Sequence, residues 1–397
     1  MKLTEQTQLP LNENLSQMCH ISKNLYNLAN YYVRQEFFYL DQWVRYYDLW
    51  FMLKSSDPYQ NLSSQTAQQI LMQVDRNWKS FFRAMREWRK EPKKFLGRPK
   101  PPSYKQKSGE NLLMFTNQQC RIRNGYLYFP KKTGLVPIKT RIKERLCHVR
   151  IIPRGIYYML EIVYEKEETD LGLNKERIVG IDIGLNNIVT LANNAGLPPA
   201  IIKGGAVKSI NQYYNKLLAR YKHKKDKQGL FHETNRLQKI TRKRNNLIKD
   251  KFHKISRKII NYCITHDFGT IVIGYNPRWK QKIKLRKSVT QQFVQLPYHS
   301  LLGKISYKAQ LVGIEVILCE ESYTSKCSFL DQEPIKRHKS YCGKRISRGL
   351  FRSKKGKVLN ADVNAAYNII RKALPNALWA DGIEGVGFHP YSLEICS

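Results

Sequence analysis

The 397-residue sequence predicts an α/β fold in its second half, preceded by a helical segment and a β-rich segment. Two patterns carry this prediction. After residue 178, short runs of β-branched and aliphatic residues alternate with longer helical patterns, which is typical of a mixed sheet packed against helices. Before that point, the spacing of apolar residues changes from three or four to two, as expected where helices give way to strands. With 42% hydrophobic residues, the chain can bury a core in two or three domains.

The N-terminal half is expected to contain three parts. Residues 15–94 carry apolar side chains at three- and four-residue steps and predict a helical domain. Residues 95–110 hold several prolines, a glycine and basic side chains, which predict a rigid basic linker. Residues 111–170 change to period two, with a hairpin around Asn124 and Gly125, and predict a small β-barrel whose first strand would come from residues 1–14.

Residues 175–397 are expected to form the α/β domain. Its predicted strands are residues 177–183, 188–192, 270–274 and 315–319, and its predicted helices are residues 233–262, 301–311 and 361–373. This order of elements corresponds to a mixed sheet of the kind found in the ribonuclease-H superfamily.

The charge balance points to a polyanionic partner. The chain carries 69 Lys and Arg against 31 Asp and Glu, a formal excess of 38 positive charges spread along its whole length. Nucleic acid is the leading candidate, because neutralising phosphates releases counterions. An anionic membrane surface is the weaker alternative, since the cations are interleaved with aromatic residues suited to stacking on bases. No stretch is long and apolar enough to span a bilayer, and the eight cysteines lack the spacing of a disulfide framework, so we expect reduced thiols.

Three short segments of the α/β domain carry acids. Asp182 lies in a β-branched strand, Glu320 and Glu321 follow a later strand, and Asp362 begins the last helix. Brought together, Asp182, one of the two glutamates and Asp362 would hold a divalent metal, because Mg²⁺ selects carboxylate and water oxygens. Taken singly, each acid has an ordinary explanation: a turn contact for Asp182, helix capping for Asp362 and simple exposure for the glutamates.

At these positions the sequence resembles a known family. The segments Gly180-Ile-Asp-Ile-Gly-Leu-Asn186, Tyr323-Thr-Ser-Lys326 and Asn360-Ala-Asp-Val-Asn-Ala-Ala-Tyr-Asn-Ile369 resemble the split RuvC nuclease motifs of the TnpB (OrfB) proteins of bacterial insertion sequences. The resemblance covers essentially the whole chain. It implies a RuvC-like ribonuclease-H fold nuclease domain, preceded by a wedge-type β-barrel with an inserted helical recognition domain.

The same resemblance implies a function and its components. These would be a transposon-associated, RNA-guided DNA endonuclease that cuts target DNA next to a short flanking motif, with guide RNA and target DNA as partners. Two Mg²⁺ ions would be held by Asp182, Glu321 and Asp362, one activating the attacking water and the other stabilising the leaving 3′ oxygen. The protein would be cytoplasmic and nucleoid-associated in a prokaryote. The oligomeric state is left open.

The sequence departs from the family pattern at the second acid. That acid usually follows a strand such as residues 270–273, but here Gly274 stands in its place and is followed by residues 275–279. A glutamate just before the Tyr323 segment resembles the rearranged active site of some TnpB branches and of the eukaryotic Fanzor relatives. Glu321 occupies the matching position, and the choice between Glu321 and Glu320 rests on this resemblance.

A second departure concerns the zinc ribbon that the family carries between these motifs. Two Cys-x-x-Cys pairs would be strong evidence for zinc. Here Leu330 and Arg345 stand where Cys327 and Cys342 would need a second cysteine. We therefore expect no zinc and interpret residues 327–357 as a degraded ribbon.

Several residues are candidates for nucleic-acid contact. Residues 236–258 contain ten Lys or Arg and one acid, Asp250, around a helical apolar stripe, so one face packs and the others present charge. The candidates are Lys239, Arg242, Lys243, Arg244, Lys254 and Arg257 in this helix, Arg98 and Lys100 in the linker, and Lys23, Asn24, Tyr26, Asn27, Trp78 and Lys79 in the helical domain. The alternative interpretation of the aromatic residues is that they belong to the hydrophobic core.

Two other functions remain open. Gly274 favours an RNA-guided DNA-binding regulator that has lost cleavage. A conventional transposase with its own DNA-binding domain would be distinguished by the absence of a defined bound RNA.

Overall fold

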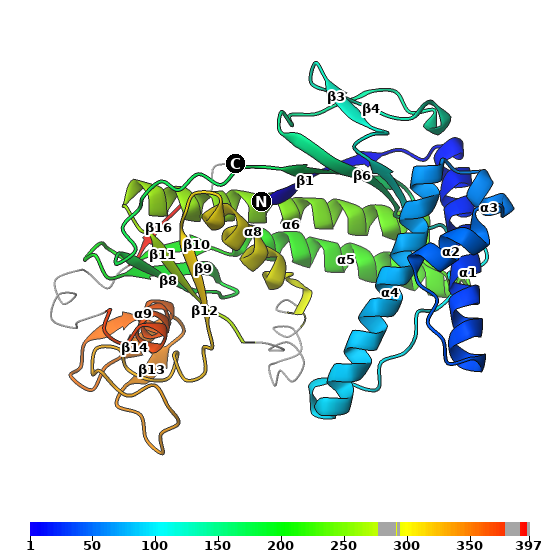
Figure 1. The fold of residues 1–397 in the computed structure, drawn as a ribbon. Helices are drawn as coiled ribbons and strands as arrows, with labels where there is room; N and C mark the ends of the chain where they lie inside the picture. The colour runs from blue at the N-terminus through cyan, green and yellow to red at the C-terminus, as the bar shows by residue number, and fades with distance from the viewer. Residues whose placement is uncertain (277–290, 292–293, 378–389, 395–397) are drawn as a thin grey trace. The chain divides into compact units, whose positions relative to one another are not determined.

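The structure is a computed structural model that describes residues 1–276, 291, 294–377 and 390–394. The chain forms two compact units, Met1–Lys166 and Glu167–Ser397 (Figure 1). The boundary between them falls a few residues before the expected one. Among the described residues, no helix has both the length and the apolar character that a membrane span requires.

The helices of the first unit form one packed group. Its helices are α1 (Glu13–Tyr39), α2 (Tyr46–Leu53), α3 (Asp57–Gln60) and α4 (Ser64–Lys90). Asn12 caps α1 by accepting the backbone N–H of Leu15 at 3.0 Å, which satisfies a donor that has no partner within the helix. The two long helices α1 and α4 pack through their apolar stripes, and Trp78 lies fully buried between them, donating its indole N–H to Asn30 at 2.9 Å.

The strands of the first unit form two separate sheets. One is antiparallel in the order β1 (Lys2–Leu9), β7 (Tyr158–Glu165), β6 (Arg145–Pro153) and β2 (Leu113–Thr116), and the other consists of β3 (Arg121–Arg123), β4 (Tyr126–Tyr128) and β5 (Ile138–Lys139). The hairpin predicted around Asn124 and Gly125 is confirmed, since both residues have positive φ and Arg123 pairs with Tyr126. Within residues 1–166, all of which are described, β1 and β2 are the edges of the first sheet, and the small β-barrel that we expected is not confirmed. Strands β3 to β5 have only two or three residues each, too few to join the longer strands.

The basic linker lies along α1 and is fastened to it by side chains. Lys23 donates to the carbonyl of Lys107 at 2.7 Å, and Asn27 both donates to the carbonyl of Lys105 at 2.9 Å and accepts its N–H at 2.8 Å. Asn30 donates to the carbonyl of Pro102 at 3.1 Å. These contacts satisfy backbone groups of a segment that has no secondary structure of its own.

A mixed six-stranded sheet forms the centre of the second unit. The strand order is β12 (Glu315–Cys319), β11 (Thr270–Gly274), β8 (Ile178–Asp182), β9 (Asn187–Asn193), β10 (Ala200–Lys203) and β16 (Tyr391–Ser392). Strand β11 runs parallel to both β8 and β12, whereas β9 runs antiparallel to β8 and β10. The mixed sheet predicted for this half of the chain is confirmed.

Helices cover both faces of this sheet. They are α5 (Gly205–Lys227), α6 (Asn235–Thr265), α8 (Tyr298–Gln310) and α9 (Ala361–Ala373). Val179 and Ile181 pack with apolar residues of α6 and α8, whereas Ile178 and Val272 pack with apolar residues of α9. Because neighbouring residues of a strand point to opposite faces, α9 lies on one face of the sheet, and α6 and α8 lie on the other. A small sheet of β13 (Lys344–Ser347), β14 (Leu350–Arg352) and β15 (Val358–Asn360) precedes α9.

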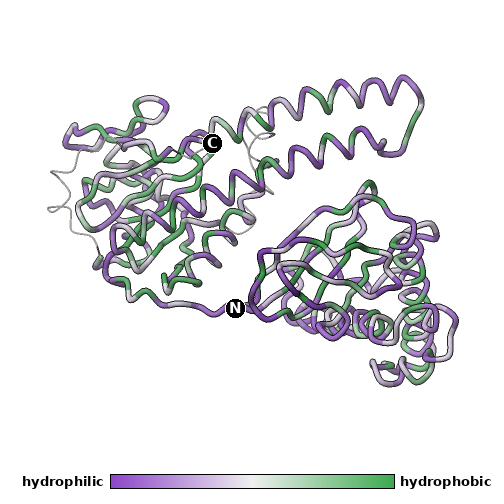
Figure 2. Tube along the Cα trace, turned by 90° about the horizontal axis from the view of Figure 1, so that it is seen from above, coloured by the Kyte–Doolittle hydropathy of each residue, from purple (hydrophilic) through white to green (hydrophobic). Residues whose placement is uncertain are grey.

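Helices α5 and α6 pair along their length and present mostly polar surface. In Figure 2 the two long helices are mainly in the hydrophilic colour, with a thinner apolar seam. Ile248, Phe252, Ile255 and Ile259 of α6 form a buried apolar stripe. The helical stripe predicted for this segment is confirmed.

The contact between α1 and the linker gives a stability prediction. Asn27→Ala leaves the N–H and carbonyl of Lys105 without their partner, which should lower the free energy of unfolding of this unit by about 1–3 kcal/mol. Limited trypsin digestion should then cut faster after Lys105 and Lys107. The matched control is Asn24→Ala, an exposed position on the same helix. Equal cleavage rates in both variants would contradict the account.

Candidate active site

Asp182 lies at the end of β8 on the sheet face that α9 covers. Ile178 packs with α9, and residues 180 and 182 share its side of the strand because side chains alternate. Gly180 is required for this approach: a Cβ atom there would lie 2.6 Å from the carbonyl oxygen of Ala366 in α9. The glycine therefore lets α9 lie against the strand, one step before Asp182.

Asp362 lies in the first turn of α9 without acting as its cap. Asn360 is the N-cap, and its side-chain oxygen accepts the N–H of Asp362 at 2.9 Å and of Val363 at 3.3 Å. One carboxylate oxygen of Asp362 accepts from the Asn187 side-chain amide at 2.8 Å. The other lies 3.7 Å from a guanidinium nitrogen of Arg345 in β13.

Glu321 fills the space beside Gly274. Ile317 and Cys319 of β12 pack on the α9 side, and Glu321 follows two residues after the end of this strand. A Cβ atom at Gly274 would lie 3.0 Å from a carboxylate oxygen of Glu321 and 2.6 Å from Ile369. With Glu321 in this position, an acid side chain at residue 274 would collide with it.

Glu320 is directed elsewhere. Its carboxylate pairs with Lys372 near the end of α9 and accepts from Ser322. Glu320 is also exposed, whereas Glu321 is mostly buried. The two neighbouring glutamates therefore have different surroundings.

The side chain of Asn276 holds Glu321 at two points. Its amide nitrogen donates to the Glu321 carboxylate at 3.1 Å, and its oxygen accepts the Glu321 backbone N–H at 3.2 Å. Asn276 follows β11, so the strand that lacks the usual acid supplies the residue that orients the replacement. Residues 277–279 of the same segment lie outside the described residues.

The pKa values of Asp182 and Glu321 are both raised. Burial raises the pKa of Asp182 well above its usual range, and the nearby carboxylates of Asp362 and Glu321 raise it further, while Arg345 opposes the shift. Burial, with a smaller contribution from Glu320, raises the pKa of Glu321 to about 7, against the opposing charge of Lys372. Burial is the largest cause of both shifts, because it disfavours the charged form of a carboxyl group.

The residues suit a hard cation by their chemistry. Among the residues that the structure describes, no group of three or more His, Cys, Asp or Glu side chains is arranged closely enough to hold one ion. Asp182, Glu321 and Asp362 are therefore electrostatic neighbours and not a preformed coordination shell. Their donor set nevertheless consists of carboxylates, which Mg²⁺ prefers, and a divalent cation would relieve the repulsion that raises the pKa of Asp182.

The asparagines of α9 hold the chain that follows Glu321. Asn364 accepts the N–H of Phe329 at 2.9 Å and donates to the carbonyl of Cys327 at 2.9 Å. Asn368 donates to the carbonyls of Thr324 and Cys327, both at 2.8 Å. Both asparagines are fully buried, so the repeated Asn of this motif joins the helix of Asp362 to the loop of Glu321.

A buried carboxylate stands at the centre of the segment that we interpreted as a degraded ribbon. Glu333 is 3% exposed and accepts the backbone N–H of Ser328 at 2.8 Å and of Cys342 at 2.9 Å. The thiol of Cys327 lies 3.4 Å from the carbonyl oxygen of Pro334. Hydrogen bonds to Glu333 therefore tie together the two ends of this loop.

The predicted nucleic-acid contacts divide into buried and exposed groups. Lys23, Tyr26 and Trp78 are at most 4% exposed, and their polar atoms bond within the protein, so their assignment to nucleic acid was wrong. Their helical spacing belongs to the core. Asn27 fastens the linker, and Lys79 pairs with Asp75 at 2.6 Å.

Arg244 is also occupied within the protein. It donates to the side chain of Asn211 at 2.8 Å and to the carbonyl of Gln295 at 2.6 Å. It therefore joins α5 to the segment before α8. The exposed candidates are Asn24, Arg98, Lys100, Lys239, Lys243 and Arg257, while Arg242 and Lys254 are partly exposed. For these residues contact with nucleic acid stays a prediction.

Three polar residues of the site were not found from the sequence. Asn187, Asn276 and Arg345 each contact one of the acids, but none lies within a few residues of its partner in the chain. The available signals were the short run Leu-Asn-Asn187 after β8 and the asparagine two residues beyond Gly274. No pattern in the sequence predicted the contact of Arg345 with Asp362, because this contact depends on how the hairpin of β13 folds.

Comparison with known families agrees with this arrangement. Residues 161–280 match the family OrfB_IS605, described as a probable transposase, and residues 298–369 match the Cas12f1-like TNB domain. The first match includes Asp182 and Gly274, and the second includes Glu321, Arg345 and Asp362.

Individual relatives are distant. The CRISPR-associated endodeoxyribonuclease Cas12f1 of Sulfoacidibacillus thermotolerans is 27% identical over 232 residues, covering 55% of this chain and 50% of the relative. The TnpB-like protein ORF457 of Acidianus two-tailed virus is 23% identical over 413 residues, covering 91% of this chain and 83% of that protein. The CRISPR-associated endodeoxyribonuclease Cas12f2 of Micrarchaeota archaeon (strain CG1_02_47_40) is 28% identical, and the alignment covers 41% of it. This chain thus spans about half the length of the two Cas12f relatives, or less.

Solved structures share the fold. The Cas12f1 chain of a complex with sgRNA and target DNA has a TM-score of 0.54 at 17% identity, covering 89% of this chain and 81% of that chain. The mini-RNA-guided endonuclease CRISPR-Cas_phi3 has a TM-score of 0.51 at 12% identity, covering 94% of this chain and 92% of that chain. At these identities the likeness concerns the fold alone.

The resemblance to the TnpB (OrfB) proteins is confirmed. Its support is the match of residues 161–280 to OrfB_IS605 and of residues 298–369 to the Cas12f1-like TNB domain, together with similar proteins named Cas12f and TnpB-like.

The raised pKa of Glu321 predicts how stability depends on pH. Because the folded state favours the protonated carboxyl, the free energy of unfolding of the metal-free protein should be highest below the ordinary glutamate pKa. It should fall as the pH rises through about 7, by up to about 3 kcal/mol. Urea unfolding between about pH 5 and about pH 8 measures this slope.

Glu321→Gln should flatten that profile, with Asp182 leaving a residual slope of the same sign. Glu315→Gln, at the exposed start of the same strand, is the control and should leave the profile unchanged. A Glu321→Gln profile as steep as that of the wild type would show that the carboxyl is not buried among charges.

Proposed function

We propose that this protein is a transposon-associated, RNA-guided DNA endonuclease that hydrolyses target DNA next to a short flanking motif. One observation supports the proposal above all: Glu321 fills the space beside Gly274, on the face that carries Asp182 and Asp362. The acid that the family usually has after β11 is absent here, and Glu321, which follows the neighbouring strand β12, would take its place. The named activity of the Cas12f relatives supports the same function.

Asp182, Glu321 and Asp362 would hold the Mg²⁺ ions. Bound there, Mg²⁺ would supply a nucleophilic water at neutral pH and charge stabilisation at the scissile phosphate. A carboxylate without a neighbouring lysine or arginine binds a cation more favourably than one whose charge is already neutralised, because no existing ion pair has to be weakened. This is the reason to prefer Glu321 over Glu320, whose charge Lys372 already neutralises.

The surrounding residues would orient these acids and the DNA. Asn187 donates to one oxygen of Asp362, and Arg345 lies beside the other. Asn276 donates to one oxygen of Glu321, which would leave the other oxygen of Glu321 for a ligand. The guanidinium of Arg345 is 57% exposed and lies beside Asp362, where it can meet a phosphate oxygen of the DNA. The exposed cations of α6 would hold the guide–target duplex through its backbone, without reading sequence.

A groove between α5 and α6 supports this last contact. It has a volume of about 620 Å³ and is lined by Tyr213, Lys239 and Lys243, among others. Tyr213 is 63% exposed, and neither lysine forms an ion pair with any residue that the structure describes. The groove therefore offers uncompensated positive charge beside an aromatic ring.

An RNA-guided regulator without nuclease activity is the second candidate function. Gly274 is the observation that favours it, because the strand that usually bears the acid bears none. The two candidates share the guide RNA and the target DNA and differ only in cleavage.

Changing the acids tests the proposal. With the protein purified together with its bound RNA, Asp182→Asn, Glu321→Gln and Asp362→Asn should each lower guided cleavage by at least about 100-fold, while target binding persists on the basic surface. Glu320→Gln is the matched control and should cut nearly as fast as the wild type.

If Glu320→Gln loses cleavage and Glu321→Gln keeps it, the two glutamates are assigned the wrong way round. A wild-type protein that binds its target but never cuts it with Mg²⁺ or Mn²⁺ would favour the regulator.

Asn276 should set how well the site binds metal. Asn276→Ala frees the Glu321 carboxylate to turn, so the Mg²⁺ concentration giving half-maximal cleavage should rise by about 10-fold to 100-fold. Asn276→Asp should be at least as severe, because it places a second negative charge against Glu321. Target binding should not change in either variant. A lowered maximal rate with an unchanged Mg²⁺ requirement would contradict an orienting role.

A further inference from the structure

The helical group of the first unit contains a cavity whose lining is both aromatic and cationic. It has a volume of about 730 Å³ and lies where the ends of α1 and α4 meet the linker. Its aromatic walls are Phe37, Phe38, Trp43, Phe81 and Phe82. Its cationic residues are Arg86, Arg89, Arg98 and Lys100, and one acid, Asp41, also lines it.

The cations of this cavity are largely uncompensated. Arg86, Arg89 and Lys100 are exposed and form no ion pair with any residue in the described part of the chain. Arg98 lies over the ring of Trp88, 5.9 Å from its centroid, and also lacks an acidic partner there. Nearby Lys94 does find one, pairing with Glu91 at 2.8 Å. Four cations against one acid therefore give the cavity a positive potential suited to an anion.

Two rings of the aromatic walls already carry an arginine over one face. Arg34 lies 5.2 Å from the ring centroid of Phe38, and Arg45 lies 4.9 Å from that of Trp43. Trp43 packs against Phe82 with ring centroids 4.9 Å apart, and Phe37 meets Phe81 and Phe82 edge to face. Phe38 is 54% exposed. The indole N–H of Trp43 is buried and has no acceptor among the described residues, which is costly unless a ligand or water supplies one.

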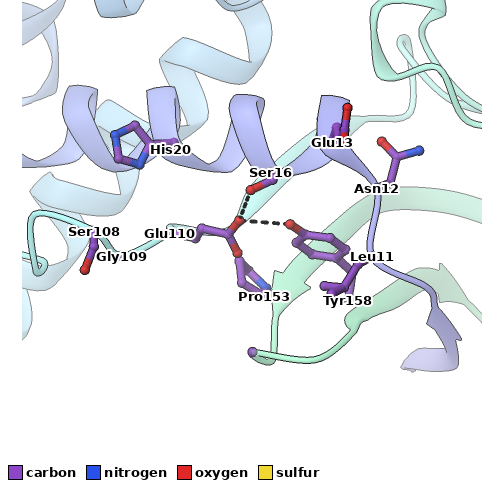
Figure 3. A pocket seen from close by; sticks show the side chains of 11 residues that line it. Leu11, Asn12, Glu13, Ser16, His20, Ser108, Gly109, Glu110, Pro153 and Tyr158 are labelled. Atoms are coloured by element: carbon purple, nitrogen blue, oxygen red, sulfur yellow. Dashed lines mark hydrogen bonds between the residues drawn. The ribbon is translucent and has the colours of Figure 1, made fainter. Parts of the chain in front are cut away.

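A second cavity of the same unit is nearly equal in size but opposite in character. It measures about 740 Å³ and is lined by Glu13, Glu110 and His20, among others (Figure 3). The Glu110 carboxylate accepts hydrogen bonds from Ser16 at 2.7 Å and Tyr158 at 2.9 Å, joining α1 to β7. Its acidic lining repels phosphate. Of these two cavities of similar volume, only the cationic one therefore suits a nucleotide.

We propose that the aromatic and cationic cavity binds an unpaired nucleotide of a single-stranded nucleic acid. The base would stack on Phe38 and Trp43, and the phosphate would lie against Arg86, Arg89 and Lys100. The inference rests on the proposed function only in assuming that the protein works on nucleic acid. It adds a site for an unpaired base, separate from the carboxylates.

Short oligonucleotides test this site on the full chain. The affinity of the protein is measured in parallel for fluorescently labelled five-nucleotide single strands of DNA and of RNA. The strand that binds more tightly shows whether the cavity takes a DNA or an RNA nucleotide. Phe38→Ala and Arg89→Gln should each weaken binding of the favoured strand by about 10-fold. Phe38→Tyr and Arg89→Lys should retain most of the binding. Arg83→Gln, an exposed position of α4 that does not line the cavity, is the control.

Photocrosslinking of a strand containing 5-iodouracil locates the base. We expect crosslinks to Phe38 or Trp43 in the wild type, lost in Phe38→Ala. The Asp182→Asn variant should bind and crosslink as the wild type does, so that this result is independent of cleavage. Equal binding by all variants, with crosslinks elsewhere, would overturn the proposal. So would a Phe38→Ala variant that changes only the self-association of the protein, since the cavity would then receive another protein surface.

Discussion

The close packing of helix α9 against strands β8 and β11 determines the candidate active site. Gly180 lets the helix backbone approach the strand, and Gly274 leaves space on the next strand for the side chain of Glu321. Asp362 begins the helix, so its position depends directly on this approach. A larger residue at 180 would displace α9 from Asp182 and separate the acids. The site is thus a consequence of backbone contact as much as of the acids themselves.

The electrostatics of the site oppose those of the whole protein. A formal excess of 38 positive charges favours binding of nucleic acid anywhere on the surface. Against this background, Asp182 lies near the carboxylates of Glu321 and Asp362, and these add to the effect of burial in raising its pKa. A cation that enters the site would relieve this repulsion and would be attracted further by a bound phosphate. Metal and DNA binding should therefore support each other at this place.

The sequence predicted the parts of this architecture that depend on local patterns. The mixed sheet, the apolar stripe of α6 and the hairpin at Asn124 and Gly125 follow from residue periods and turn residues, and the structure confirms them. The choice of Glu321 over Glu320 came from the family resemblance, because β12 ends at Cys319 and strand alternation does not extend past that end.

What the sequence could not predict depends on contacts between distant segments. Asn276 contacts Glu321 from the neighbouring strand end, and Arg345 contacts Asp362 from a separate hairpin. Their spacing along the chain therefore did not predict these contacts. The buried positions of Lys23, Tyr26 and Trp78 were misjudged for a related reason. A lysine on a helix is usually exposed, and only the linker lying on α1 shows why this one is not. The small β-barrel is not confirmed, because period two predicts strands but not which edges pair.

The position of bound metal tests the central claim most directly. A structure of the protein with its nucleic acid, Mn²⁺ and the anomalous scattering of that ion would locate the metal independently of activity. The account predicts Mn²⁺ contacted by Asp182, Asp362 and Glu321, with Asn276 still bonded to Glu321. Mn²⁺ held by Glu320, or bound between Asp182 and Asp362 with Glu321 turned away, would contradict it.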